Sequence, residues 1–244
     1  MLSELRRFDY WPSLNTRTAS LAVAGWKEKN WGKASYWIAP DGTPLNETEA
    51  FIELIWPELF INPYNRIVHQ AVSSAQVWHR DQRRTDGKPY FDHLFRVADQ
   101  VYQLTTDADC VMAALLHDSI EDQGITSEAL DHRFNHDVAY MVSALTNDYS
   151  DHLPHEEKLA AVQKHTEDNI VDDRTKLIKL VDRLDNIMDT SGWKPARILR
   201  YCENTEVLLK ALHLEDYFGK SSPHLWLSRE IMQRVKNLRE IHKE

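Results

Sequence analysis

A histidine and three carboxylic acids directly follow a run of apolar residues in the segment AALLHDSIED, residues 113–122. In a continuous helix, residues four apart lie on one face, so His117 would stand above Glu121, and Asp118 above Asp122. Half-buried imidazoles and carboxylates destabilise a fold unless they find compensating partners. A histidine on an apolar helix is often just a hydrogen-bonded core residue, so the rest of the chain must decide between burial and chemistry.

Two further polar residues interrupt apolar segments elsewhere in the chain. His93 begins an apolar stripe that continues with Val97 and Val101, and Asp182 interrupts the run LIKLVDRL. The set His93, His117, Asp118 and Asp182 could converge on one divalent cation from three helices. Two imidazoles and two carboxylates form a mixed nitrogen and oxygen set that suits manganese, iron or zinc.

The residues around these four fit hydrolytic chemistry. A cation lowers the pKa of water that it binds, which makes hydroxide available near neutral pH. Glu121 and Asp122, one turn beyond the expected ligands, would orient that water or move its proton. Asn186, one turn after Asp182, would donate a hydrogen bond to substrate or water.

A basic cluster lies upstream, in the segment HRDQRR at 79–84 followed by Lys88. Such a run is often only a solvated surface. Beside a phosphate-binding pocket, Arg83, Arg84 and Lys88 would instead supply the cations that a phosphorylated substrate needs.

Three segments carry a resemblance to a known family. They are HRDQRRTDGKPYFDH (79–93), AALLHDSIED (113–122) and KLVDRLDN (179–186). In this order they resemble the HD metal-dependent phosphohydrolases, and within them the hydrolase domain of the RelA/SpoT alarmone enzymes and its stand-alone relatives. The family patterns are HxGQxRKxGxPYxxHP, AALLHDxxED and KLADRLHN, and the matching region covers roughly half of the chain.

The resemblance implies a role for each residue that matches a family pattern. It implies His93, His117, Asp118 and Asp182 as metal ligands, most often for Mn²⁺, and Glu121 with Asp122 as the pair that activates water. It places Arg84 on a guanine base and Asn186 near the nucleoside. The implied reaction removes pyrophosphate from the ribose 3′ position of guanosine tetra- or pentaphosphate (ppGpp or pppGpp, the nucleotides of the stringent response).

Four positions depart from the family pattern and keep other substrates open. Leu94 stands where proline is usual, Thr85 replaces a lysine, Asp185 replaces a histidine, and Asp189 stands where a base-contacting threonine is common. The changes at Thr85, Asp185 and Asp189 favour an alternative: an HD phosphohydrolase acting on a deoxynucleoside triphosphate, a monophosphate or a cyclic nucleotide. A third hypothesis is a catalytically silent nucleotide sensor, which the presence of all four ligands and of Glu121–Asp122 disfavours.

Apolar periodicity predicts an all-α fold, an HD-type helical bundle, that would position these residues. The expected helices cover 47–58, 63–82, 90–104, 107–121, 126–134, 135–146, 154–168, 171–190, 195–215 and 223–242. Residues 1–60 read as a Trp-rich appendage with a hairpin near 35–45, and residues 61–244 as the hydrolase domain. The appendage would pack on the bundle or form an oligomer or partner interface. The last helices look like packing helices that leave no room for a synthetase domain, so we expect hydrolysis only.

Composition limits the classes of function. The chain has 244 residues, 42% of them hydrophobic and 27% charged, which is typical of a globular protein. A net charge of −9 argues against nucleic-acid or acidic-membrane binding but leaves room for a small nucleotide substrate, and a homo-oligomer remains open. Cys110 and Cys202 fit buried thiols better than a disulfide, and no apolar run is long enough for a membrane span or signal peptide. We therefore expect a cytoplasmic protein.

Overall fold

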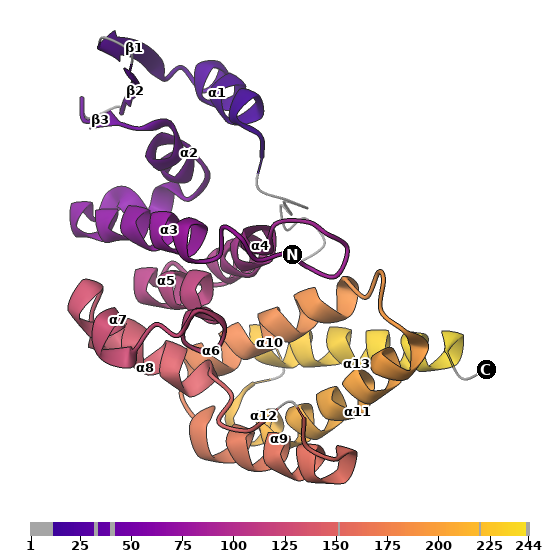
Figure 1. The fold of residues 1–244 in the computed structure, drawn as a ribbon. Helices are drawn as coiled ribbons and strands as arrows, with labels where there is room; N and C mark the ends of the chain where they lie inside the picture. Colours follow the sequence, from indigo (N-terminus) through magenta and orange to yellow (C-terminus); the bar gives the residue numbers. More distant parts are fainter. Residues whose placement is uncertain (1–11, 32–33, 40–41, 151, 220, 243–244) are drawn as a thin grey trace.

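Helices make up most of the chain, which confirms the expected all-α class (Figure 1). The computed structural model describes residues 12–31, 34–39, 42–150, 152–219 and 221–242. In the described residues, the strands form one small antiparallel sheet, in which each strand pairs with the next one along the chain. None of the described helices combines the length and hydropathy that a membrane-spanning segment requires.

The N-terminal region contains the sheet between two helices. Its elements are α1 (Leu14–Val23), β1 (Lys27–Trp31), β2 (Ala34–Ile38), β3 (Pro44–Leu45) and α2 (Glu47–Ile55). The hairpin expected near 35–45 forms from β2 and β3, although Asp41 of its Asp-Gly turn lies outside the described residues. Helix α1 and strand β1 were missed from the sequence, because α1 has no strong apolar stripe and β1 reads KEKNW, a charged segment without apolar alternation.

Trp56 connects this region to the helical body. Its side chain is fully buried after α2, its ring stacks on Phe95 with centroids 5.8 Å apart, and its indole N–H donates to Asp99 Oδ1 at 2.9 Å. Trp37 on β2 is also buried, at 3% exposed. At these two tryptophans the aromatic residues serve as packing, in line with the large apolar area that an indole buries.

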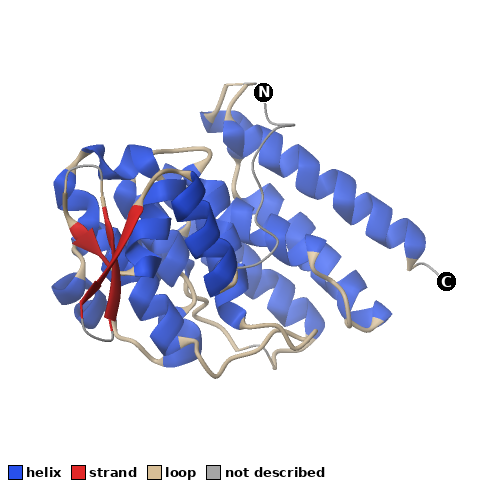
Figure 2. Ribbon diagram, turned by 90° about the horizontal axis from the view of Figure 1, so that it is seen from above, coloured by secondary structure: helices blue, strands red, loops and turns tan. Residues whose placement is uncertain are grey.

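Residues 57–145 form the first part of the body. The elements are the 3₁₀ turns η1 (Pro57–Ile61) and η2 (Pro63–Arg66), followed by the helices α3 (Ile67–Trp78), α4 (Tyr90–Tyr102), α5 (Ala108–Leu116), α6 (Ser119–Gln123), α7 (Ser127–Arg133) and α8 (His136–Leu145). The remaining elements are α9 (His155–Asn169), α10 (Asp173–Met188), α11 (Pro195–Ala211), α12 (Leu214–Tyr217) and α13 (Pro223–Ile241). In Figure 1 the sheet lies at the end of the molecule remote from α11 and α13, and in Figure 2 it lies on the side opposite the C-terminal helix, α13.

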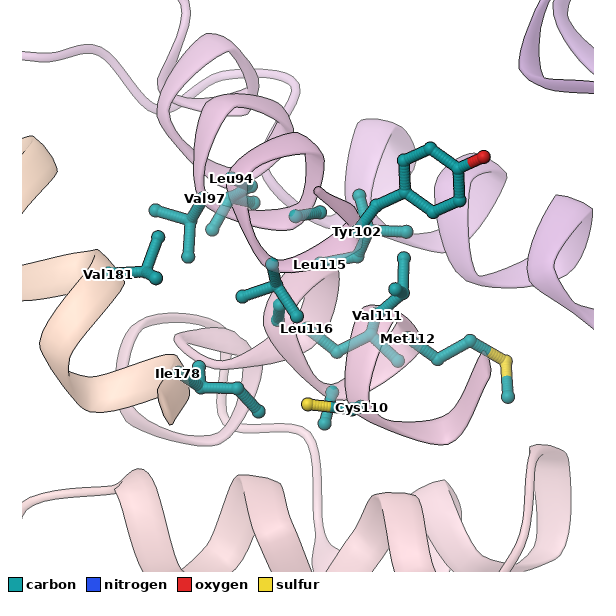
Figure 3. Packing of buried hydrophobic residues seen from close by; sticks show 14 of the residues in the cluster. Leu94, Val97, Tyr102, Cys110, Val111, Met112, Leu115, Leu116, Ile178 and Val181 are labelled. Carbon is teal, nitrogen blue, oxygen red and sulfur yellow. The ribbon is translucent and has the colours of Figure 1, made fainter. Parts of the chain in front are cut away.

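Helix α5 is apolar on every side and forms the centre of the core. It packs against α3, α4, α8 and α10, which explains why its sequence lacks a polar face. Figure 3 shows side chains of α4, α5 and α10 meeting in this core: Leu94, Val97, Leu115, Leu116, Ile178 and Val181. Cys110 on α5 and Cys202 on α11 are free, buried thiols, as expected. The three helices that carry the metal-ligand candidates are thus held together by one apolar cluster.

The single helix expected over 107–121 is wrong, because the structure interrupts it at His117 and Asp118. Helix α5 ends at Leu116 and α6 begins at Ser119. Nδ1 of His117 donates to the carbonyl oxygen of Ala114 at 2.8 Å, the acceptor that a continuous α-helix would use for the Asp118 N–H. The backbone resumes helical bonding when Asp122 N–H donates to the Asp118 carbonyl oxygen at 2.9 Å. His117 and Asp118 therefore lie at a helix junction rather than within one helix.

Candidate active site

The four predicted ligands lie near one another in the body, and ligand atoms of His93, His117 and Asp118 all lie within 4.8 Å of one another. His93 lies on α4, Asp182 on α10, and His117 and Asp118 at the α5–α6 junction. Nε2 of His117 lies 3.1 Å from Asp118 Oδ2 and 3.6 Å from Asp182 Oδ1. Nε2 of His93 lies 3.3 Å from Asp182 Oδ1 and 3.9 Å from Asp118 Oδ2. Atoms that share a cation with bonds of about 2.0–2.2 Å lie about 3.0–4.2 Å apart, so these separations suit a common divalent ion.

The two imidazoles present their free nitrogens to this point. Nδ1 of His117 donates to Ala114, and Nδ1 of His93 donates to Asp185 Oδ2 at 2.7 Å. Each Nε2 is buried and makes no hydrogen bond, although polar atoms in a protein interior are almost always paired. A cation would satisfy both lone pairs, and a histidine ligand whose other nitrogen donates to an oxygen is the usual arrangement at metal sites. The residues present therefore fit a metal ion.

Opposite charges compensate one another in this cluster. Burial lowers the pKa of His117, but the negative charge of Asp118 and the closeness of Nε2 to the Asp118 and Asp182 carboxylates outweigh it and hold that pKa well above its usual value. Burial also works against ionisation of Asp182, yet His117 and His93 keep its pKa well below the ordinary range. Both carboxylates therefore stay ionised, as a cation requires.

Two polar side chains orient the carboxylates. The Tyr90 hydroxyl donates to Asp118 Oδ2 at 2.6 Å, and Asn186 Nδ2 donates to Asp182 Oδ1 at 2.6 Å. Asn186 was expected one turn after Asp182, and it lies there. The hydrogen bond of Tyr90 to Asp118 was not predicted from the sequence; the place of Tyr90 three residues before His93 on α4 was the available signal.

Glu121 and Asp122 lie at the solvent edge of the cluster, on α6. Asn147 donates to Glu121 through its backbone N–H at 3.1 Å and through its side chain, and Gln82 donates to Asp122 Oδ2 at 2.7 Å. Partial burial raises the pKa of Glu121, and Asp118 adds to the rise against the hydrogen bonds from Asn147. Burial raises the pKa of Asp122 as well, with Asp118 adding to it. Carboxylates with raised pKa values are suited to accept a proton.

A cavity of about 160 Å³ opens onto three of the four metal-ligand candidates. His117, Asp118, Asp182, Glu121, Asn186 and Lys179 are among its lining residues. Lys179 is 7% exposed, and its Nζ donates to the Leu145 carbonyl oxygen at 3.3 Å. Within the described part of the chain, no salt bridge to a carboxylate is found for Lys179. A buried ammonium group thus faces the same cavity as the ligands.

A second, basic cavity of about 670 Å³ adjoins the first. The two cavities share Asn147, Arg183 and Tyr201 as lining residues. Arg197 and Arg200 on α11 also line the basic cavity, and the guanidinium of Arg183 lies 4.5 Å from the ring centroid of Tyr201. The sequence reading treated α11 as a packing helix and missed these residues, although two arginines and a tyrosine within five positions were a usable signal.

The predicted substrate-binding residues occupy different environments. Arg84 is 12% exposed and donates to Asn186 Oδ1 at 2.9 Å. Arg83 donates to the backbone carbonyl oxygens of Arg80 and Gln82, and Lys88 pairs with Asp86 at 2.8 Å on the surface. Arg84 is therefore joined to the ligand cluster through Asn186, whereas Arg83 and Lys88 have local partners outside both cavities.

The chain is similar to a known domain family and to two stand-alone hydrolases. The pattern described as "HD domain" matches residues 71–208. The chain is 34% identical over 155 residues to the guanosine-3′,5′-bis(diphosphate) 3′-pyrophosphohydrolase MESH1 of Danio rerio, covering 60% of this chain and 84% of that protein. The MESH1 of Drosophila melanogaster is 36% identical over 141 residues, which covers 54% of this chain and 76% of the relative.

Longer bacterial proteins and a solved structure match the same region. A probable GTP pyrophosphokinase of Mycobacterium leprae is 32% identical over 148 residues, 60% of this chain, but the match spans only 19% of that protein's length. The solved structure is described as a metazoan SpoT ortholog that hydrolyses ppGpp. It matches with a TM-score of 0.56 and 26% identity, over 72% of this chain and 94% of the other.

Proposed function

This chain belongs to the HD domain family, and we propose that it is a metal-dependent phosphohydrolase that removes the 3′-pyrophosphate of guanosine tetra- or pentaphosphate. The observation that carries the proposal is that His117, Asp118 and Asp182 line a cavity that adjoins a basic one, with Nε2 of His93 3.3 Å from Asp182 Oδ1. The stand-alone relatives named as guanosine-3′,5′-bis(diphosphate) 3′-pyrophosphohydrolases support this substrate. The products would be GDP or GTP and pyrophosphate.

The four ligand candidates would hold Mn²⁺, since their mixed imidazole and carboxylate set suits that ion. When bound, the cation supplies a Lewis acid that polarises a phosphoryl oxygen and lowers the pKa of water. Tyr90 and Asn186 keep the two carboxylates directed to this point through their hydrogen bonds. His93 and His117 are held by their Nδ1 bonds, so little reorganisation is needed on binding.

The acids on α6 would handle the proton of the attacking water. Glu121 lines the cavity and accepts that proton, while Asn147 holds its carboxylate in place. Water oxygen adds to the phosphorus attached to the ribose 3′ oxygen, the bond between that phosphorus and the 3′ oxygen breaks, and the 3′ oxygen takes up a proton. Asp122, tied to Gln82, would orient the water beside Glu121.

Charged side chains around the two cavities suit a substrate with several phosphates. Lys179 faces the phosphate that reacts, and the arginines of the basic cavity are suited to bind the remaining phosphates, since guanidinium groups pair with phosphate oxygens in a bidentate manner. Arg84 would stack on the guanine base next to Asn186. Arg83 and Lys88 would contribute to the basic surface near the entrance.

A second candidate substrate is another nucleotide. It is favoured by Asp189, whose Oδ2 lies 3.6 Å from Arg84 Nε and thus puts a carboxylate where the base is expected. Free buried thiols at Cys110 and Cys202 support a reducing compartment such as the cytoplasm. The division at residue 60 and a homo-oligomeric state stay predictions.

Product analysis tests the proposed reaction. The purified protein with Mn²⁺ would be incubated separately with guanosine tetraphosphate and with a panel of ordinary, deoxy and cyclic nucleotides. We expect GDP and pyrophosphate from the tetraphosphate. Turnover of the panel alone, with the tetraphosphate intact, would keep the metal chemistry and overturn the substrate.

A further inference from the structure

Asp185 forms a two-pronged ion pair with Arg96 directly behind His93. Arg96 Nε lies 2.7 Å from Asp185 Oδ1, and its NH2 group donates to Oδ2 at 2.8 Å. The side chain of Asp185 is 6% exposed and that of Arg96 is 14% exposed. Asp185 stands on α10, Arg96 on α4, so the pair also ties together the two helices that carry His93 and Asp182.

The same carboxylate determines which nitrogen of His93 faces the ligand cluster. Nδ1 of His93 donates to Asp185 Oδ2 at 2.7 Å, because an ionised carboxylate can only accept. The Nε2 lone pair is therefore directed to the cluster, 3.3 Å from Asp182 Oδ1. His93 is fully buried, so no water competes for its Nδ1 hydrogen.

Arg96 keeps this carboxylate charged in a buried place. The two oxygens of Asp185 accept three hydrogen bonds of 2.7–2.8 Å, one from His93 and two from Arg96, while the side chain is only 6% exposed. A buried carboxylate without a cationic partner would protonate or move towards solvent. The arginine thus preserves the acceptor that His93 needs.

A second acid, Asp189 at the C-terminal end of α10, also lies near Arg96. Asp189 Oδ2 lies 3.6 Å from Arg96 NH2 and 3.6 Å from Arg84 Nε. Asp185 and Asp189 are the two positions where the resembling family has histidine and threonine. Both departures therefore contribute to one ion cluster centred on Arg96, and Asp189 also contacts Arg84.

We propose that Asp185, anchored by Arg96, is a positioning residue that holds the imidazole of His93 in the tautomer and orientation required to bind a divalent cation. The inference rests on the proposed function, because it takes the cluster to be a metal site. Asp185 touches neither cation nor substrate and acts only through His93. Carboxylates placed in this way at metal-bound histidines change metal affinity by about 10–100-fold when they are replaced.

Metal affinity measured without nucleotide tests the inference. Metal-free wild-type protein and the Asp185→Asn variant would be titrated with Mn²⁺ by calorimetry and by the electron paramagnetic resonance of free Mn²⁺. We expect the variant to bind about 10–100-fold more weakly. Equal affinity of variant and wild type would overturn the inference.

Asp99→Asn is the matched control. Asp99 is a buried carboxylate on α4, 2% exposed and held by Trp56, six positions after His93. Its replacement should lower the melting temperature but leave Mn²⁺ affinity within about twofold of wild type. An equal loss of metal affinity in both variants would mean that the effect comes from general destabilisation, and would overturn the positioning role.

Arg96→Lys provides a second variant should Asp185→Asn not fold. Lysine retains the positive charge but cannot donate from two nitrogens to both carboxylate oxygens. We expect weaker Mn²⁺ binding than in wild type, with the helical circular dichroism unchanged. Unchanged affinity in a folded Arg96→Lys protein would contradict the anchoring role.

Failure of the inference can be told apart from failure of the proposed function. If the wild type binds Mn²⁺ but hydrolyses no nucleotide, the proposed function fails while the loss of affinity in Asp185→Asn still supports the inference. If the wild type hydrolyses the tetraphosphate and Asp185→Asn binds Mn²⁺ as tightly, the inference alone fails. A wild type that binds no divalent cation would overturn both.

Discussion

The guanidinium of Arg84 donates a 2.9 Å hydrogen bond to Asn186 Oδ1, across 102 positions of sequence. Asn186 in turn donates to Asp182 Oδ1 at 2.6 Å, so the amide group uses its oxygen for the arginine and its nitrogen for the ligand candidate. Asp189 lies on the other side of Arg84, 3.6 Å away. Arg84 is therefore fixed before any nucleotide binds, and two successive hydrogen bonds connect it to Asp182, an expected metal ligand.

Arg84→Ala should raise KM for guanosine tetraphosphate about tenfold and change kcat much less, because the residue would hold the base rather than the reacting phosphate. Steady-state kinetics over a range of tetraphosphate concentrations would measure both constants. Arg80→Ala is the control, since Arg80 lies four positions earlier and its side chain is 73% exposed. An unchanged KM would remove Arg84 from the binding site.

His117→Ala and Asp118→Ala should each abolish measurable Mn²⁺ binding and phosphohydrolase activity. Each substitution removes one of four expected ligands and leaves the remaining buried charges uncompensated. The helical circular dichroism should persist, because the core around α5 consists of apolar contacts that neither residue makes up. Full activity of either variant would contradict the assignment of the site.

Glu121→Gln should lower kcat by about 10²–10⁴-fold while Mn²⁺ affinity stays close to wild type, because glutamine can orient water but cannot accept its proton. Asn147 can still donate to the amide oxygen of the substituted side chain, so the fold at α6 should be retained. Glu157→Gln, at an exposed glutamate on α9, is the control. Turnover at the wild-type rate would exclude Glu121 as the base.

The double variant Arg197→Ala/Arg200→Ala should raise KM for the tetraphosphate by at least about tenfold with a smaller effect on kcat. Both guanidinium groups line the basic cavity, where they would pair with phosphates remote from the reacting one. The wild-type KM should rise with salt, and this dependence should be weaker in the variant. Arg229→Ala, an exposed arginine on α13, should leave both constants unchanged. Identical salt dependence in the double variant would argue against phosphate binding in this cavity.

The stability of the protein should fall as the pH drops from about 6.5 towards 4, partly through His69. Burial lowers the pKa of His69 to about 4, and Arg66 adds to the decrease. The unfolded chain, with an ordinary histidine pKa of 6.5, takes up a proton in this range while the folded state does not, so acid favours unfolding. Glu53 lies 3.4 Å from Nε2 and would partly compensate a protonated ring, so we expect a loss of about 1–2 kcal/mol.

Urea unfolding at several pH values would measure this loss. His69→Gln should flatten the decline in the free energy of unfolding between pH 6.5 and 4, whereas His132→Gln, at an exposed histidine on α7, should not. A decline of equal slope in the His69 variant would assign the acid sensitivity to other groups.

Local pattern was sufficient for most helices and for the candidate ligands. Apolar periodicity predicted α4 and α10 within two residues of their observed ends, because a helix that buries one face must repeat its apolar residues every three to four positions. The polar interruptions at His93 and Asp182 stood out against that period. Such signals depend only on neighbours along the chain, and they are readable without knowledge of the fold.

Contacts between segments that are distant in sequence could not be predicted from local pattern. Asp185 looked like a departure within a nucleoside pocket until α4 brought Arg96 and His93 against it, 89 and 92 positions away. At the junction, the His117 side chain donates to the Ala114 carbonyl oxygen, which a backbone N–H would otherwise use. Helix propensities do not describe this competition between a side chain and the backbone.

The amino-acid sequence by itself determined the helical class, the family and the residue types available for metal chemistry, since these follow from local periodicity and motif spacing. Only the tertiary structure decided which nitrogen of each histidine is free, which carboxylates are charged and which arginines share a cavity with the site. The physical reason is that the packing of α4, α5, α10 and α11 sets the hydrogen-bond partners, the burial and the neighbouring charges of each side chain. A shift of a few ångströms in that packing would change all three properties.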